Sequence, residues 1–129
     1  MLDEQTSAPP LESLQAVAGA TDVLQLVEAA RGVYVEESLG RYVVALLRQT
    51  RGDPRLYLGA SPRAGIALLR VAKARALAEG RDYVAPDDVK AVAAPVLAHR
   101  LILAPEARSA ALSAEELVAD ALARTPVPV

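Results

Sequence analysis

The sequence of 129 residues contains no cysteine, no phenylalanine and no tryptophan, and only one histidine. The absence of cysteine excludes disulfide bonds and thiol chemistry, and it fits a cytoplasmic protein, because disulfides are rare in that compartment. With four tyrosines as its only aromatic residues, the chain must build its core from aliphatic side chains and alanine. Side chains of this size favour close packing of helices over a sheet sandwich.

Long hydrophobic runs and a strong charge of either sign are also missing. No apolar run approaches the roughly 18 residues that a membrane span needs, and no signal peptide is visible. Fourteen basic and sixteen acidic residues give a net charge of -2, so bulk electrostatics do not attract the chain to nucleic acid. The length fits one domain. We therefore expect neither a membrane span nor a nucleic-acid partner.

Motifs that carry catalysis are absent as well. The chain has no glycine-rich phosphate-binding loop of the Walker A type, and no strand ends in paired acids that would hold magnesium. His99 has no cysteine or carboxylate cluster nearby, so we expect a hydrogen-bonded structural residue rather than a metal ligand. Asp87 and Asp88 fall in a first helical turn, where acids stabilise the helix dipole. We expect no metal site, and no catalysis by this chain alone.

Apolar residues recur with helical spacing in several segments of the chain. The pattern predicts an all-α fold, a small bundle of four to five helices joined by short extended links. Helices are expected at about 23–30, 36–51, 62–79, from 86 onward, and at 113–124, where a capping box marks the start. Pro95 should kink or shorten the fourth helix. Residues 105–112 are expected to form a loop.

The organisation along the chain follows from these segments. Residues 1–18 are expected to be a linker or hinge, 19–125 the helical domain and 126–129 a C-terminal tail. Within the helix at 62–79, the apolar side is expected to include Ile66, Leu69 and Ala72. The arginines should then be spread over its other sides.

The stretch 59–64, Gly-Ala-Ser-Pro-Arg-Ala, is the most informative in the chain. Ser61 suits an N-cap and Pro62 the first helical position, while Gly59 permits a close backbone approach. Arg63 is then held in the first turn, where a cation is unfavourable by up to about 1 kcal/mol. The same helix end offers free N–H groups, so an anionic partner would turn this misfit into an attraction.

This stretch and its surroundings resemble the C-terminal lid of MoxR-family AAA+ ATPases. The resemblance covers about residues 11–128 in unbroken order, and its matching segments are 42–46, 50–51, 58–64, 68–74, 79–84, 86–90, 96–101 and 126–128. In that family the lid follows an α/β core that carries the Walker motifs. The resemblance therefore implies that residues 1–18 are the hinge and the last remnant of such a core.

The resemblance also implies a role for the stretch itself. Arg63 matches the sensor-2 arginine, which reaches from the lid to the γ-phosphate of ATP held by the core, and Gly59, Ser61 and Pro62 form the loop that presents it. The full-length protein would be an ATPase that uses ATP and Mg²⁺, whereas this chain alone should bind neither. Its partners would be its own AAA+ core and neighbouring subunits of a ring, expected to be a hexamer. A von Willebrand factor A domain protein would be a further partner, in a chaperone-like maturation of other complexes.

Other interpretations stay open on the residues alone. Arg63 could be a surface arginine paired with Asp82 or Asp87. The chain could be a helix-turn-helix DNA binder, since four basic residues share one helix, namely Arg63, Arg70, Lys73 and Arg75. The acidic balance of the chain and the apolar residues between these cations argue against DNA binding. A stand-alone helical adaptor is the third alternative.

Overall fold

The computed structural model describes residues 14–128, and six α-helices follow one another in this range. They are α1 (Ala20–Gly32), α2 (Glu37–Arg51), α3 (Pro62–Ala78), α4 (Pro86–Leu97), α5 (Pro105–Ser109) and α6 (Ala114–Arg124). Two short strands, β1 (Leu56–Leu58) and β2 (Ile102–Leu103), pair in antiparallel fashion, and a 3-10 turn (Ala98–Arg100) precedes β2. The expected all-α bundle is confirmed. No helix in the described range is long and apolar enough to cross a membrane.

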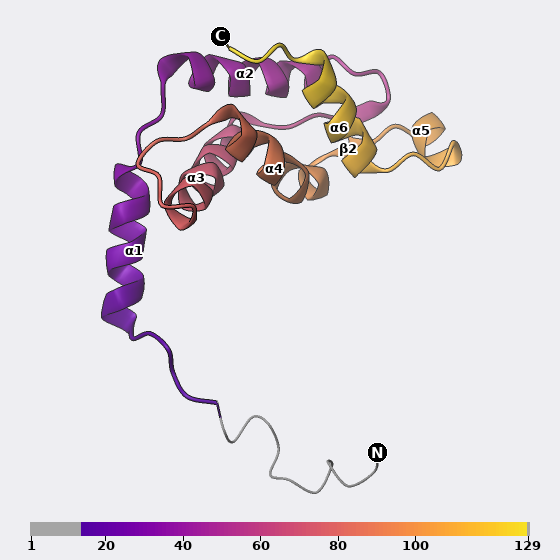
Figure 1. The fold of residues 1–129 in the computed structure, drawn as a ribbon. Helices are drawn as coiled ribbons and strands as arrows, with labels where there is room; N and C mark the ends of the chain where they lie inside the picture. Colours follow the sequence, from indigo (N-terminus) through magenta and orange to yellow (C-terminus); the bar gives the residue numbers. More distant parts are fainter. Residues whose placement is uncertain (1–13, 129) are drawn as a thin grey trace, which may run out of the picture.

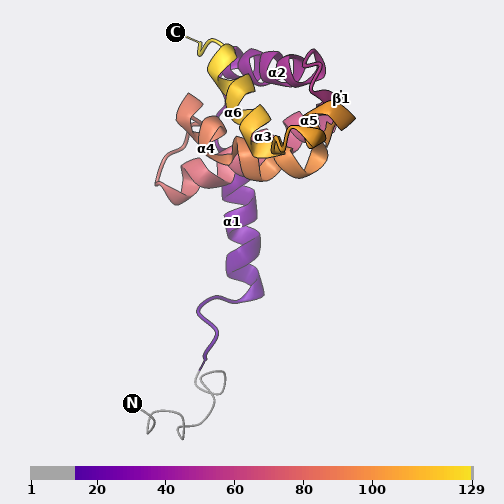
Figure 2. The same ribbon diagram turned by 90° about the vertical axis from the view of Figure 1, so that its right-hand side faces the viewer.

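Helices α2, α3, α4 and α6 pack together around one aliphatic core, whereas α1 projects away from them (Figure 1, Figure 2). Each of the four packed helices contributes a completely buried side chain, in order Leu46, Leu68, Leu97 and Val118. Burying one such side chain contributes about 1.5–3 kcal/mol to folding. Helix α1 buries none of its residues, so the stability of the bundle comes mainly from α2, α3, α4 and α6.

Helix α3 lies at the centre of the core and contacts its neighbours mainly through small residues. Its buried positions are Ala64, Gly65, Leu68, Ala72 and Ala76. Gly65 approaches α2 so closely that a Cβ atom there would lie 2.7 Å from Leu47 Cδ1.

The apolar side expected for α3 is therefore wrong in part. Ile66 is 55% exposed, and Leu69 is only half-buried. The reason is that α3 packs closely on α2 and α4, and such an approach selects alanine and glycine over larger side chains. Ile66 faces away from the core, and Leu69 lies at its edge, partly packed against it.

The two short extended links of the bundle lie side by side. The Tyr34 N–H donates to Asp82 O at 2.7 Å, and the Val84 N–H donates to Tyr34 O at 2.9 Å. This parallel bridge joins the link before α2 to the link before α4. The bridge therefore holds the N-terminal ends of α2 and α4 close together.

Two expected assignments, the start of α1 and the loop at 105–112, differ from the structure, and α4 ends soon after Pro95. Helix α1 begins at Ala20 because the Asp22 carboxylate accepts the Gly19 N–H at 2.7 Å. Helix α4 continues two residues past Pro95 and then tightens into the 3-10 turn. The expected loop at 105–112 is wrong, because residues 105–109 form the one-turn helix α5. Its Ala107 is buried against the bundle.

The described part of the expected hinge, residues 14–18, contains no helix or strand. Leu14 and Val17 are exposed, so this segment does not pack on the bundle. The other residues of the expected hinge lie outside the described range.

Candidate functional site

The start of α3 has the capped geometry that the sequence predicts. Ser61 has extended backbone angles (φ -79°, ψ 163°), and its hydroxyl accepts the Ala64 N–H at 3.4 Å. Pro62 occupies the first turn, where its missing N–H costs nothing. A Cβ atom on Gly59 would lie 2.7 Å from the backbone of Arg51 and of Thr50, so the expected close approach is present. The loop is thus pressed against the C-terminal end of α2.

Arg63 follows directly in the first turn of α3, and its side chain is exposed. Within residues 14–128 it forms no ion pair and no side-chain hydrogen bond. A pairing with Asp87 is not found, because that carboxylate contacts Lys90 at 3.3 Å, and no contact joins Arg63 to Asp82. The first turn of α3 contains no acidic residue. A free guanidinium therefore stands at the positive end of a 17-residue helix.

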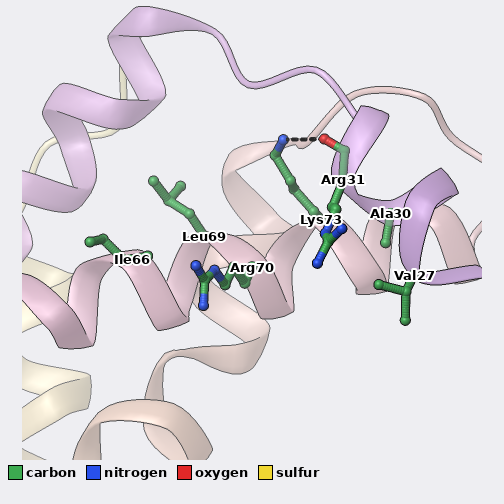
Figure 3. Close-up of a pocket in the computed structure, with 7 residues that line it drawn as sticks. All are labelled: Val27, Ala30, Arg31, Ile66, Leu69, Arg70 and Lys73. Carbon is green, nitrogen blue, oxygen red and sulfur yellow. Dashed lines mark hydrogen bonds between the residues drawn. The ribbon is translucent and has the colours of Figure 1, made fainter. Parts of the chain in front are cut away.

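A groove of about 540 Å³ lies between α1 and α3 (Figure 3). Its apolar residues are Val27, Ala30, Ile66 and Leu69, and its basic residues are Arg31, Arg70 and Lys73. No acidic residue of the described chain lines it. The Lys73 ammonium donates to Arg31 O at 2.8 Å, which ties α3 to the end of α1.

The groove lies on the side of α3 that carries Arg63. Ile66 and Arg70 follow Arg63 by three and seven residues, and a helix places residues at these spacings on one side. Arg63 itself does not line the groove. Its guanidinium extends the basic surface by one helical turn toward the N-terminus of α3. The whole side thus combines apolar surface with several cations, a combination that suits an anionic ligand or partner with an apolar part.

Sequence reasoning found Arg63 but missed this groove. The signal was present in the spacing of Arg63, Ile66 and Arg70 along one helix. The contribution of Val27 and Arg31 depends on where α1 packs, which no local pattern reports.

The other basic residue of α3 that was considered for DNA binding lies elsewhere. Arg75 contacts Glu79 at 3.9 Å and Asp88 at 3.4 Å. Arg75 is exposed but paired with these acids, and it does not extend the row formed by Arg63, Arg70 and Lys73.

Asp88 is buried and structural, which goes beyond the expected dipole effect. It accepts two hydrogen bonds of 2.7 Å from Arg81 and a third from the Ala85 N–H at 2.8 Å. The Arg81 guanidinium holds the pKa of Asp88 below its ordinary value, against the opposing effect of burial. Ala85 has no capping side chain, so Asp88 supplies the bond at the start of α4.

His99 is hydrogen-bonded within its own segment, as expected. Its Nδ1 lies 3.1 Å from the Pro95 carbonyl oxygen. Within the described part of the chain, no group of three histidine, cysteine or acidic side chains lies close enough together to hold a metal ion.

Comparison with known families decides what kind of domain this is. The sequence pattern of the AAA lid domain matches residues 48–121, more than half of the chain. The chain belongs to the AAA lid domain family. The matched range includes the loop 59–64, α3 and most of the groove.

Relatives of the lid carry the MoxR name. The lid is 36% identical over 116 residues to the chaperone MoxR1 of Mycobacterium tuberculosis, covering 83% of the chain and 31% of MoxR1. It is 39% identical over 112 residues to the protein MoxR of Paracoccus denitrificans, with 75% of the chain and 33% of that protein covered. The uncharacterised protein YeaC of Bacillus subtilis is 37% identical over 129 residues, the whole chain and 40% of YeaC.

A solved structure has the same fold. The crystal structure of a protein from Cytophaga hutchinsonii, described provisionally as an ATPase, superposes with a TM-score of 0.79 at 35% identity. The match covers 84% of the lid and 36% of that chain. The lid thus spans about two fifths or less of the length of these relatives. The resemblance to the C-terminal lid of MoxR-family AAA+ ATPases is confirmed.

Proposed function

We propose that this lid closes over ATP held by an AAA+ core of the full-length protein and senses the γ-phosphate through Arg63. The observation that carries the proposal is the exposed guanidinium at the start of α3, which has no acidic partner in the described range. An arginine fork can donate two parallel hydrogen bonds to phosphoryl oxygens. The positive end of the α3 dipole favours the same negative charge.

The groove between α1 and α3 supports this proposal. Closure would bring the basic and apolar side of α3 toward the core, with Arg70 and Lys73 adding positive potential near the nucleotide. Gly59, Ser61 and Pro62 would hold the start of α3 so that Arg63 reaches the phosphate. ATP, with its Mg²⁺, supplies the reacting phosphoanhydride bond and is held by the core.

Hydrolysis would remove the anion that Arg63 contacts. The lid would then lose that attraction and move relative to the core, so bond cleavage would drive domain motion. We further propose that the full-length protein works as a ring of subunits, expected to be a hexamer, in a chaperone-like role. A von Willebrand factor A domain protein is the partner we expect beside it.

The experiment that tests the proposal is Arg63→Ala in the full-length protein, with ATP binding and turnover measured separately. We expect turnover to fall about 100-fold or more, as when a positioned donor to a developing charge is removed. ATP affinity should change much less, because the core supplies most contacts. The matched control is Arg108→Ala on α5, an exposed arginine that also has no ion pair in residues 14–128.

Equal turnover in the two variants would contradict the proposal. Calorimetric titration of the 129-residue chain with ATP should show no binding in the micromolar range, because one arginine and one helix end offer too few contacts. Titration with labelled duplex DNA at low salt tests the alternative. A tight complex with a steep salt dependence would favour a DNA-binding role instead.

A further inference from the structure

One buried hydroxyl attaches the loop before α3 to the end of α2. Thr50 is 1% exposed, and its Oγ1 accepts the Ala60 N–H at 3.0 Å. The same hydroxyl donates to Leu47 O at 2.8 Å, which fixes the direction of its lone pairs. Ala60 is completely buried, and within the described residues its N–H has no other acceptor. Water therefore cannot replace Thr50 at this point.

The attachment lies three residues before Arg63 and is reinforced on both sides. Gly59 touches the backbone of Arg51, where a Cβ atom would approach to 2.7 Å. A Cβ atom on Gly65 would lie equally close to the Leu47 side chain. The backbone that carries Arg63 is thus held to α2 before and after it, while the guanidinium itself is free.

We propose that Thr50 is a positioning residue for Arg63, acting through its hydrogen bond to Ala60. This inference rests on the proposed function, because the place of Arg63 matters only if Arg63 meets a phosphate. A displacement of about 1 Å in a group that contacts the reacting centre can cost about 100-fold in rate. Release of Ala60 from α2 would allow a displacement of that order at the first turn of α3.

The chain offers a matched control for the loss of such a hydroxyl. Thr125 is 3% exposed, and its Oγ1 donates to Ala121 O at 2.7 Å. It resembles Thr50 in burial and in its bond to a carbonyl of the preceding turn. It differs because no bond joins it to the loop before α3. Thr125→Val therefore measures the general cost of removing a buried threonine hydroxyl.

The test uses the full-length protein with the variants Thr50→Val, Thr50→Ser and Thr125→Val, each alone and combined with Arg63→Ala. Hydrogen exchange at single-amide resolution should show that Ala60 loses protection in T50V and keeps it in T50S and T125V. We expect T50V to lower kcat for ATP at least about tenfold with a smaller change in KM. T50S should restore most of the turnover, and T125V should leave it unchanged.

The combination with Arg63→Ala separates positioning from stability. In the R63A background, T50V should lower turnover less than about twofold further, since the group that it positions is gone. Wild-type-like turnover of T50V beside an impaired R63A would overturn this inference and leave the proposed function standing. A T50V loss that is equally large in the R63A background would overturn it as well. Unchanged turnover of R63A would overturn both.

A second variant covers the case in which T50V does not fold, as judged by circular dichroism. Gly59→Ala keeps the Thr50 hydroxyl but forces the loop away from the Arg51 backbone. We expect the same loss of kcat and the same dependence on Arg63. A folded G59A protein with unchanged kcat would overturn the inference.

Discussion

Arg124 Nη2 donates a hydrogen bond to Asp53 Oδ2 at 2.8 Å and so joins the end of α6 to the loop after α2. The two residues are 71 positions apart in the sequence. Asp53 is 4% exposed and also accepts bonds from the Nε, Nη2 and backbone N–H of Arg55. Arg55 in turn contacts Asp120 of α6 at 2.8 Å. This cluster holds α6 against the segment between α2 and β1.

We expect Asp53→Asn to lower the free energy of unfolding by about 2 kcal/mol, since hydrogen bonds to a charged group contribute about 1.5–3 kcal/mol. Urea unfolding followed by circular dichroism measures the change. Arg124→Gln should cost less, because that side chain is half exposed and solvent screens its charge. An Asp53→Asn variant as stable as the wild type would mean that the cluster does not hold α6.

Acid should lower the free energy of unfolding of the lid, because two carboxylates have lowered pKa values in the folded state. The hydrogen bonds from Arg55, together with that from Arg124, hold the pKa of Asp53 well below its ordinary value despite burial. The pKa of Asp88 is lowered in the same way, chiefly by Arg81. In the unfolded chain both groups return to a pKa near about 3.9, so the unfolded chain binds more protons as the pH falls.

The stability that these two carboxylates contribute is therefore complete above about pH 5 and is lost as the pH falls through their folded pKa values. Free energies of unfolding should be constant between about pH 6 and pH 5 and should fall between about pH 5 and pH 3. The slope should be smaller in Asp53→Asn and in Asp88→Asn, because asparagine does not titrate. If the wild type and both variants had the same slope, other groups would be the cause of the acid sensitivity.

The starts of α3 and α6 could be predicted from local chemistry, because a capping serine precedes each of these helices. Ser113 accepts the Glu116 N–H at 3.2 Å, and the Glu116 carboxylate accepts the Ser113 N–H at 2.8 Å, as the capping box predicts. The place of Arg63 followed from Ser61 and Pro62 in the same way. These interactions join residues that are close in sequence, so the local sequence is enough to predict them.

What could not be predicted depends on contacts between distant residues. The buried side of α3 is marked by alanine and glycine, whose weak hydrophobicity hides a contact surface. The groove requires the packing of α1 on α3, and the bond from Thr50 to Ala60 spans a loop and a strand. A threonine near the end of a helix gives no sign that its hydroxyl will meet a backbone N–H ten residues later.

Tyr42→Phe should leave the free energy of unfolding unchanged or raise it by up to about 1 kcal/mol. The Tyr42 hydroxyl is buried and has no hydrogen-bond partner in the described residues. Burying an unpartnered hydroxyl costs roughly 1–3 kcal/mol, and phenylalanine removes that cost while keeping the ring. Tyr34→Phe is the control, since that exposed hydroxyl donates to Glu36 at 2.7 Å. A loss above about 1 kcal/mol for Y42F would show that its hydroxyl does have a partner.

Backbone conformation predicts opposite effects for substitutions at two positions with positive φ. Gly80 has a φ of +74° after α3, and Ala111 has a φ of 57° after α5. A side chain in the left-handed region costs about 1 kcal/mol or more, so Gly80→Ala should destabilise the lid and Ala111→Gly should stabilise it. A Cβ atom on Gly80 would meet no atom within 4 Å, so steric contact does not contribute to the loss.

Gly40→Ala is the control for this pair, because Gly40 lies inside α2 and its Cβ would also meet nothing within 4 Å. Alanine is favoured over glycine in a helix by up to about 1 kcal/mol, so G40A should raise the urea midpoint while G80A lowers it. If G40A and G80A shifted the midpoint in the same direction, the left-handed turn after α3 would not be the cause. Ala111→Gly should then fail to raise the midpoint as well, since the same backbone cost would be missing there.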